Sequence, residues 1–441
     1  MHALQAAHRL LLLLRQPLLL VPLLLLATLP GSATTVPDEP AIDVHATLRS
    51  ADLWPAVRVR QDPQGQLTLE DVRRTDEGFE APAGAASTLG VAKGPVWLRA
   101  ALRTAVDAGG EWVIDIDYPP LHVVEIALLR DGALVHRVQM GAKQPRQPGQ
   151  GRTHATMVPL EGSATYELLV RVQTEGAVIV PMRISRPGAF HERALNEQML
   201  QGVLIGLGAC LILYSLIQWL VVREAMFAKY ALMTGGSLRF SIFLHGTGGQ
   251  FLWPGSVWME LHAGGLAALM ATTGSFLFIG EVLDTTRGRW WLRRVLNAGA
   301  ALTAVLALLF VSGVIGARAV TALVSVLGLV PVLLGIPVAM RRAWRGDRIG
   351  ANLLLAWVVY FIATAVMIGV INGGLPANAW TMHAFQFGAT IDMLLFMRIL
   401  GLRVAAVHQE ARRAHRERDA LRSLALSDPL TGLLNRRGMD E

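Results

Sequence analysis

The chain of 441 residues is 53% hydrophobic and 17% charged, whereas soluble proteins carry about 25% charged residues. This composition excludes an ordinary soluble protein and indicates a membrane protein with flanking domains. The net charge of +7 would favour nucleic-acid binding in a soluble chain. Much of the arginine lies in loops between apolar segments, however, so no nucleic-acid partner is predicted. Cys210 is the single cysteine, which excludes an intrachain disulfide.

Residues 1–33 have the composition of a signal peptide. Basic residues precede the apolar run at 18–29, and Gly31, Ser32 and Ala33 offer small side chains for cleavage. An uncleaved anchor, which would add an eighth membrane helix, is the alternative. In both cases the segment that follows is exported.

From residue 36 to 188 the sequence is typical of β-structure. Short runs rich in β-branched and aromatic residues alternate with Pro and Gly, and Asp131-Gly132 predicts a tight hairpin turn. The predicted strands are residues 96–102, 111–117, 123–129 and 166–172, with no helical stretch among them. This pattern predicts an all-β domain, an antiparallel sandwich or jelly roll.

Four histidines of this region lack the spacing of metal ligands and are expected on the surface. They are His45, His122, His136 and His154. No metal site is therefore predicted.

Seven apolar segments follow between residues 198 and 400, each about as long as the roughly 20 residues that a helix needs to cross a bilayer. They are residues 199–222, 228–245, 257–280, 296–315, 320–340, 349–371 and 380–400. The loops after the first, third and fifth segments, with Lys229 at the start of the second segment, carry ten basic residues, whereas the loops after the second, fourth and sixth carry only Arg318. Because basic loops stay on the cytoplasmic side, the β-domain is predicted outside and the tail after Leu400 inside.

Polar side chains in these segments are candidates for a relay, because intramembrane charge is costly and usually faces a partner or a water-filled cavity. The candidates are Arg239, Glu260, His262, His383 and Asp392. We hypothesise that Arg239 pairs with Glu260 beneath the outer domain; alternatively, each extends separately to the interface. Asp392 precedes the tail on the seventh segment, and its alternative role is to bind a neighbouring hydroxyl or amide. Gly202 and Gly206 have the spacing of a close helix crossing, within one chain or between two.

Residues 401–427 predict a charged helix with a heptad seam. The seam consists of Val404, Val407, Ala411, Ala414, Arg418, Leu421 and Ala425. Because it continues from the seventh segment, we expect a parallel coiled coil and hence a homodimer. The alternative is a single amphipathic helix on the anionic inner leaflet.

The predicted strands at 96–102, 112–118, 124–126, 166–172 and 181–184, with the seven segments behind them, resemble bacterial seven-transmembrane receptors with diverse intracellular signalling modules. The resemblance covers most of residues 36–400. It implies a jelly-roll, carbohydrate-binding-like sensory domain in the periplasm, with an unidentified carbohydrate or protein ligand. It also implies that the bundle lies in the inner membrane and relays the state of this domain inward.

Residues 428–441 resemble the opening of the GGDEF domain of diguanylate cyclases, which join two GTP molecules into cyclic di-GMP. The matching residues are Asp428, Leu430, Thr431, Gly432, Leu433, Asn435, Arg436 and Arg437. The resemblance implies that Asn435 hydrogen-bonds the guanine base, and an amide suits this role because it offers both a donor and an acceptor.

The metal-binding carboxylates of that domain are not among the 441 residues. Phosphoryl transfer needs Mg²⁺ held by carboxylates, so the chain by itself is expected to be inactive, with no catalytic residue. The parent protein is expected to be a diguanylate cyclase that uses GTP and Mg²⁺. The alternative is a non-enzymatic receptor or regulator. A transporter would predict internal repeats, and a histidine kinase is disfavoured by residues 428–437.

Overall fold

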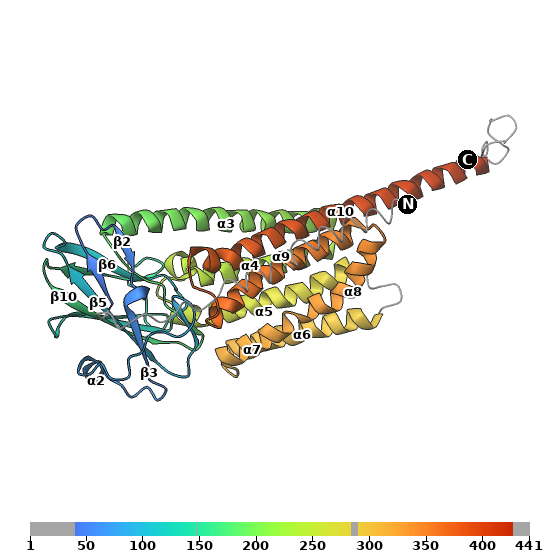
Figure 1. The fold of residues 1–441 in the computed structure, drawn as a ribbon. Helices are drawn as coiled ribbons and strands as arrows, with labels where there is room; N and C mark the ends of the chain where they lie inside the picture. Colours follow the sequence, from blue (N-terminus) through green and yellow to red (C-terminus); the bar gives the residue numbers. More distant parts are fainter. Residues whose placement is uncertain (1–39, 148, 284–289, 427–441) are drawn as a thin grey trace.

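The computed structural model describes residues 40–147, 149–283 and 290–426. They form a sheet domain at one end of the molecule and a helical bundle that extends from it (Figure 1). The predicted signal peptide and the predicted GGDEF opening, which includes Asn435, lie outside the described residues.

The sheet domain contains two main sheets and one strand pair. The first sheet has the order β1 (Ala41–Val44), β5 (Val96–Thr104), β10 (Thr165–Gln173), β7 (Val123–Arg130) and β8 (Ala133–Met140), with β3 (Val57–Gln61) also on β5. The second has the order β2 (Ser50–Asp52), β12 (Met182–Ser185), β6 (Gly110–Ile116) and β9 (His154–Leu160). The strand pair consists of β4 (Thr88–Val91) and β11 (Ala177–Ile179).

The two main sheets share one buried core, as in a β-sandwich. Leu98 of β5 and Trp112 of β6 are both completely buried in it. The predicted hairpin is confirmed, since Asp131 and Gly132 have φ angles of 51° and 78°, as a type I′ turn requires. The expectation of a fully antiparallel domain is wrong for β1 and β5, which pair in parallel. A long connection separates these two strands, so the chain can return in the same direction.

A short helix, α2 (Leu69–Arg73), lies among the strands, where the sequence predicted none. Thr68 caps its first turn, and Thr68 and Asp71 form a reciprocal capping box. Five residues are too few to show helical periodicity, which explains the wrong prediction. Leu69 packs with Trp97 in a second apolar cluster beside the first sheet.

The bundle consists of eight described helices. They are α3 (Pro187–Val222), α4 (Ala225–Leu244), α5 (Val257–Val282), α6 (Trp290–Val311), α7 (Ala317–Leu327), α8 (Val330–Trp344), α9 (Arg348–Ile371) and α10 (Ala379–Leu426). Each predicted segment falls largely on helix, and 320–340 is divided between α7 and α8. The division lies just before Pro331, which has no backbone N–H to donate to the preceding turn.

Five helical segments of the described chain are long and apolar enough to cross a membrane. They are α3, α5, α6, the combined segment Ala317–Trp344 and α9. Lys229 and Arg239 lower the apolar character of α4, and His383, Asp392 and Arg398 lower that of the predicted seventh segment. Seven spans therefore remain a proposal, although a helix covers each of them.

The first and last helices of the bundle are longer than predicted. α3 begins at Pro187, directly after β12, so residues 189–197, which lie between the two predicted domains, are helical. α10 continues without a break to Leu426 and projects beyond the rest of the bundle (Figure 1). The helix includes all the predicted heptad positions, from Val404 to Ala425. The dimeric coiled coil stays a prediction.

The close helix crossing lies elsewhere than at Gly202 and Gly206. Within the described part of the chain, a Cβ atom at either glycine would meet nothing within 4 Å. The crossing is instead between α4 and α5, where Gly236 faces the backbone of Ala271 and Gly274 faces that of Met233. The prediction of a close crossing within one chain is thus wrong for Gly202 and Gly206. The alternative, a crossing between two chains, stays a prediction.

Candidate functional site

The sheet domain is attached to the bundle by hydrogen bonds to the turn between α9 and α10. The backbone N–H of Ala85 donates to the Gly373 carbonyl over 2.9 Å, and the N–H of Ala377 donates to the Ala86 carbonyl over 2.9 Å. The hydroxyl of Thr88 donates to the Val370 carbonyl over 2.9 Å. We call this contact region, together with the side chains described below, the seam.

Apolar packing continues across the seam. Leu244 of α4, Met367 and Val370 of α9, and Ala377 before α10 all belong to the same buried cluster as the core of the sheet domain. Burying apolar surface stabilises the contact by about 25 cal/mol for each Å². The core of the sheet domain therefore packs directly against the ends of α4 and α9 and against the turn before α10, so a change in this core can reach these helices.

Arg146 of the sheet domain forms an ion pair with Glu260 in the first turn of α5. Its Nε lies 2.9 Å from Glu260 Oε1, and the two side chains are 10% and 9% exposed. Arg146 Nη1 also donates to the Gly151 carbonyl over 2.7 Å, which fixes the orientation of the guanidinium.

The predicted pair between Arg239 and Glu260 is therefore wrong. Arg239 Nη2 lies 4.0 Å from Met259 Sδ, and its buried Nε has no hydrogen-bond partner among the described residues. The loop between β8 and β9 reaches over the start of α5 and supplies Arg146 in place of Arg239. This contact joins residues 114 positions apart, so no local pattern in the sequence indicates it.

A second polar path crosses the seam through two histidines. Arg152 of the sheet domain pairs with Asp117 at 2.8 Å and donates from Nη1 to the His245 carbonyl over 3.4 Å. The rings of His245 and His383 lie 5.0 Å apart. His383 Nε2 lies 2.9 Å from Glu197 Oε1 of α3. Of the predicted relay residues, His383 thus lies at the seam, as Glu260 does.

Two glutamines continue this path between α3 and α10. Gln201 and Gln386 exchange amide hydrogen bonds of 3.0 and 2.7 Å, and Gln201 Nε2 also donates to Glu197 Oε1 over 2.9 Å. Both glutamines are buried. Neither glutamine nor Glu197 was predicted from the sequence, although an amide in an apolar helical segment is itself a signal of a polar contact.

The two remaining relay candidates do not join these paths. His262 stacks on Trp258 one turn before it, with ring centroids 4.5 Å apart. Asp392 lies farther along α10, and its Oδ1 atom is buried without a hydrogen-bond partner among the described residues. The five predicted residues therefore occupy separate places and do not form one cluster.

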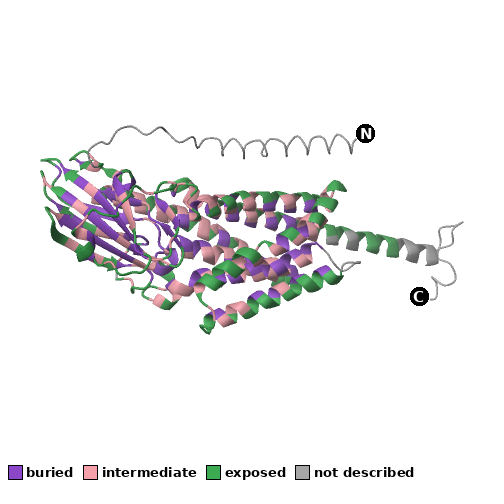
Figure 2. Cartoon of the chain, turned by 60° about the horizontal axis from the view of Figure 1, so that its bottom comes forward, coloured by how far each residue is buried: buried purple, intermediate pink, exposed green. Residues whose placement is uncertain are grey.

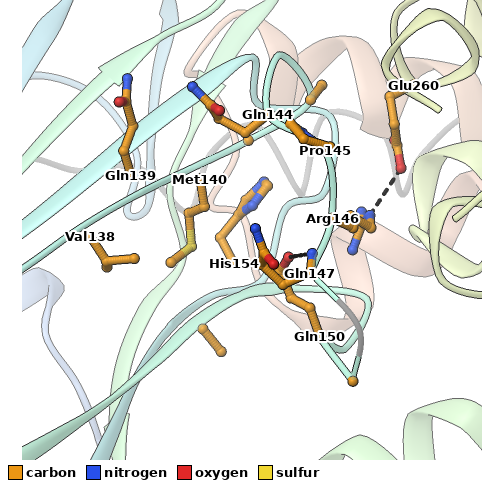
Figure 3. A pocket seen from close by; sticks show the side chains of 14 residues that line it. Val138, Gln139, Met140, Gln144, Pro145, Arg146, Gln147, Gln150, His154 and Glu260 are labelled. Atoms are coloured by element: carbon orange, nitrogen blue, oxygen red, sulfur yellow. Dashed lines mark hydrogen bonds and ion pairs between the residues drawn. The ribbon is translucent and has the colours of Figure 1, made fainter. Parts of the chain in front are cut away.

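A pocket of about 410 Å³ lies where the sheet domain meets α5. Its walls come from the end of β8, the following loop, the start of β9 and Glu260, as Figure 3 shows. The polar side chains that line it are Gln139, Gln144, Arg146, Gln147, Gln150, His154 and Glu260. A second hollow of about 290 Å³ shares Arg146, Gln147, Gly149 and Gln150 with this pocket.

His154 is buried at this pocket and not on the surface, which corrects the prediction for this histidine. It is 3% exposed, and its Nε2 lies 3.2 Å from the Pro119 carbonyl. Burial lowers the pKa of His154 to about 4, so its ring is neutral at pH 7. No group of metal-ligating side chains that could hold an ion occurs in the part of the chain that the structure describes.

Two families match this chain. Residues 197–403 match the family described as 7TM diverse intracellular signalling, and residues 55–186 match the one described as 7TMR-DISM extracellular 2. The first match covers the bundle from residue 197 of α3 to residue 403 of α10, and the second covers most of the sheet domain. No curated protein matches the chain in sequence.

Proposed function

Since both matches identify the chain as a membrane signalling receptor of the 7TMR-DISM family, we propose that it senses a stimulus at its sheet domain and controls a diguanylate cyclase through α10. The observation that carries this proposal is the course of α10. One unbroken helix begins at the seam and ends beyond the bundle at Leu426.

Contacts at both ends of the bundle support a movement of α10 as the signal. At the seam, α10 contacts α3 through His383 and Glu197. At the far end, Arg403 of α10 donates to the Glu281 carbonyl of α5, and Lys229 of α4 pairs with Glu281 at 2.6 Å. A rigid helix held at two levels transmits rotation or translation from one to the other.

The proposed orientation has the sheet domain in the periplasm and the end of α10 in the cytoplasm, with seven spans between them in the inner membrane. The arginine-rich loops support it, because they resist translocation. Two contacts support this orientation. The turn 372–378 is hydrogen-bonded to the sheet domain, whereas Arg342 donates to the Val282 carbonyl at the end of α5, next to Glu281, which Arg403 of α10 contacts.

The proposed output rests on the resemblance of residues 428–437 to the start of a GGDEF domain. In this proposal Asn435 binds guanine, GTP is the substrate and Mg²⁺ acts in the catalytic domain. A coiled coil of α10 with its copy in a second chain would bring two such domains together, and its register would set their relative rotation.

Insertions in α10 test this relay. The protein translated from the whole gene, in nanodiscs with GTP and Mg²⁺, is assayed for cyclic di-GMP by mass spectrometry. Four residues inserted after Arg413 rotate the output by about 40° relative to the bundle and should change the rate, whereas a seven-residue insertion restores the heptad register and the original rate.

Two outcomes would overturn the proposal. A product rate that does not depend on insertion length removes the relay through α10. The absence of any cyclic di-GMP favours the alternative, a non-enzymatic receptor. Reporter fusions after Gly188 and after Leu426 test the orientation, and a cytoplasmic sheet domain would contradict it.

A further inference from the structure

The pocket at the seam combines one positive and one negative side chain with many amides. Among the described residues that line it, Arg146 and Glu260 are the charged ones. His154 adds no charge at pH 7, because burial keeps its pKa near 4. The ion pair lies at one end of the pocket, and Gln139 and Met140 lie at the opposite end (Figure 3). The lining is therefore neutral overall, and both of its charges lie at one end.

Charge balance restricts which ligand can enter at the ion pair. An anion that took Arg146 would leave the Glu260 carboxylate buried without its partner, and a cation that took Glu260 would leave Arg146 unpaired. Either result is costly, because an unpaired buried charge is strongly destabilising. A ligand with both charges avoids this cost, since each of its charges replaces one half of the existing pair.

We propose that this pocket binds a small zwitterion, an α-amino acid or short peptide, whose carboxylate contacts Arg146 and whose ammonium group contacts Glu260. The volume of about 410 Å³ is within the range of small-molecule sites. The body of the ligand lies toward Met140, and the amides of Gln139 and Gln144 offer donors and acceptors to its polar groups.

This assignment rests on the proposed receptor function and gives it a point of action. Arg146 belongs to the sheet domain and Glu260 to α5, so the ligand would insert into a contact that joins sensor and bundle. A ligand shifts a conformational equilibrium only through its different affinity for the two states. In the direct ion pair, Arg146 Nε lies 2.9 Å from Glu260 Oε1. A bound zwitterion separates these two side chains and so changes the spacing between the loop and α5.

Binding is tested on the full chain in nanodiscs by calorimetric titration with the twenty L-amino acids and dialanine. The best of these probes is then compared with its N-acetyl derivative, which lacks the ammonium group, and its methyl ester, which lacks the carboxylate. Each derivative should bind at least about 10-fold more weakly, because it leaves one buried charge unpaired.

Two variants assign each charge to its residue. In Glu260→Gln the preference for the free probe over the N-acetyl derivative should fall to about 1-fold, with the preference over the ester retained. Arg146→Gln should abolish the preference over the ester instead. Arg137→Gln is the matched control, because Arg137 pairs with Glu125 at 2.7 Å on β7 and β8 and does not line the pocket. Size-exclusion profiles check that every variant is folded.

The outcomes separate this inference from the proposed function. If no probe binds the wild-type chain at millimolar concentration, or if both derivatives bind as well as the free probe, the zwitterion site is wrong. An output that still responds to insertions in α10 would then leave the receptor function intact. If the probe binds with the predicted charge dependence but the insertions have no effect, the site stands and the relay fails.

Discussion

The sheet domain and the bundle bury their apolar side chains in different ways. In the sheet domain most large apolar side chains are buried in one core, whereas the helices carry many that are exposed. Figure 2 shows buried residues along the strands and many exposed residues along the helices. Trp112 of β6 is 0% exposed, but Leu308 of α6 is 70% exposed. The sheet domain can thus be stable in water, whereas the outer face of the bundle requires a lipid environment.

The largest expected effect is a loss of stability when a side chain is removed from the core of the sheet domain. Trp112→Ala removes a side chain whose Nε1 donates to the Ala108 carbonyl over 3.0 Å and on which the Arg186 guanidinium stacks at 4.0 Å. We expect a loss of about 4 kcal/mol in the unfolding free energy of the sheet domain. Differential scanning calorimetry of the chain in nanodiscs measures it.

The control for this substitution is Leu308→Ala on the exposed face of α6. Its effect in lipid should stay within about 0.5 kcal/mol, because few protein atoms pack against this side chain. Equal losses for both variants would contradict the distinction between a core that is buried in protein and a surface that faces lipid.

The second effect is at the seam, where the two regions meet. Arg146→Glu or Glu260→Arg should weaken the docking of the sheet domain on α5 by about 3 kcal/mol, since each leaves two like charges in a buried site. The double variant restores opposite charges and should recover most of the loss. Hydrogen exchange of residues 141–153 and of the first turn of α5 measures the docking.

The matched control makes the same charge exchange with Arg239, the partner of Glu260 that the sequence predicted, in place of Arg146. Arg239→Glu combined with Glu260→Arg should show no recovery, because Arg239 contacts Met259 and not Glu260. Recovery in this pair, and none with Arg146, would mean that the seam has a different arrangement in solution.

The third effect is a steric one inside the bundle. Gly236→Val adds atoms where α4 lies against the backbone of Ala271 on α5, and overpacking of this kind costs about 2 kcal/mol. Gly202→Val adds the same atoms on α3, where space is open. Thermal unfolding of the bundle in nanodiscs should show a lower midpoint for the first variant than for the second. The reverse order would contradict the position of the crossing.

The local elements of this fold were predictable because their signals are local. Strands β5, β6, β7 and β10 follow β-branched and aromatic runs, and the helices follow long apolar segments. Family resemblance then indicated the order of the domains. Elements without a periodic pattern, such as the five residues of α2, were missed.

The candidate site was less predictable, because it depends on how two domains dock. Five polar residues of the apolar segments were selected as relay candidates, but the partner of Glu260 is Arg146, in a loop of another domain. The histidines were expected on the surface, since spacing along the chain does not report burial, but His154 faces the pocket from within. Tertiary contacts of this kind are absent from sequence periodicity.

The last expected effect is a pair of opposing pH dependences inside the sheet domain, which nearly cancel in the wild-type chain. Burial raises the pKa of Asp115 from 3.8 to about 6, although Arg193 of α3 lies 2.6 Å away and opposes this shift. Its stabilising contribution is present below pH 3.8 and is lost as the pH rises to about 6. Burial lowers the pKa of His154 from 6.5 to about 4, so its contribution is present above pH 6.5 and is lost as the pH falls to about 4.

Between about pH 4 and 6 the two dependences nearly cancel, because each amounts to at most about 1.4 kcal/mol per pH unit and their signs are opposite. Asp115→Asn removes the first, so the stability of the sheet domain should rise with pH in this interval. His154→Gln removes the second, and the stability should fall with pH instead. Calorimetric midpoints at pH 4, 5 and 6 measure both slopes. Identical slopes in the two variants would show that the two side chains are not buried as the structure places them. The interior of the sheet domain would then be open to water, and its contrast with the lipid-facing bundle would be weaker.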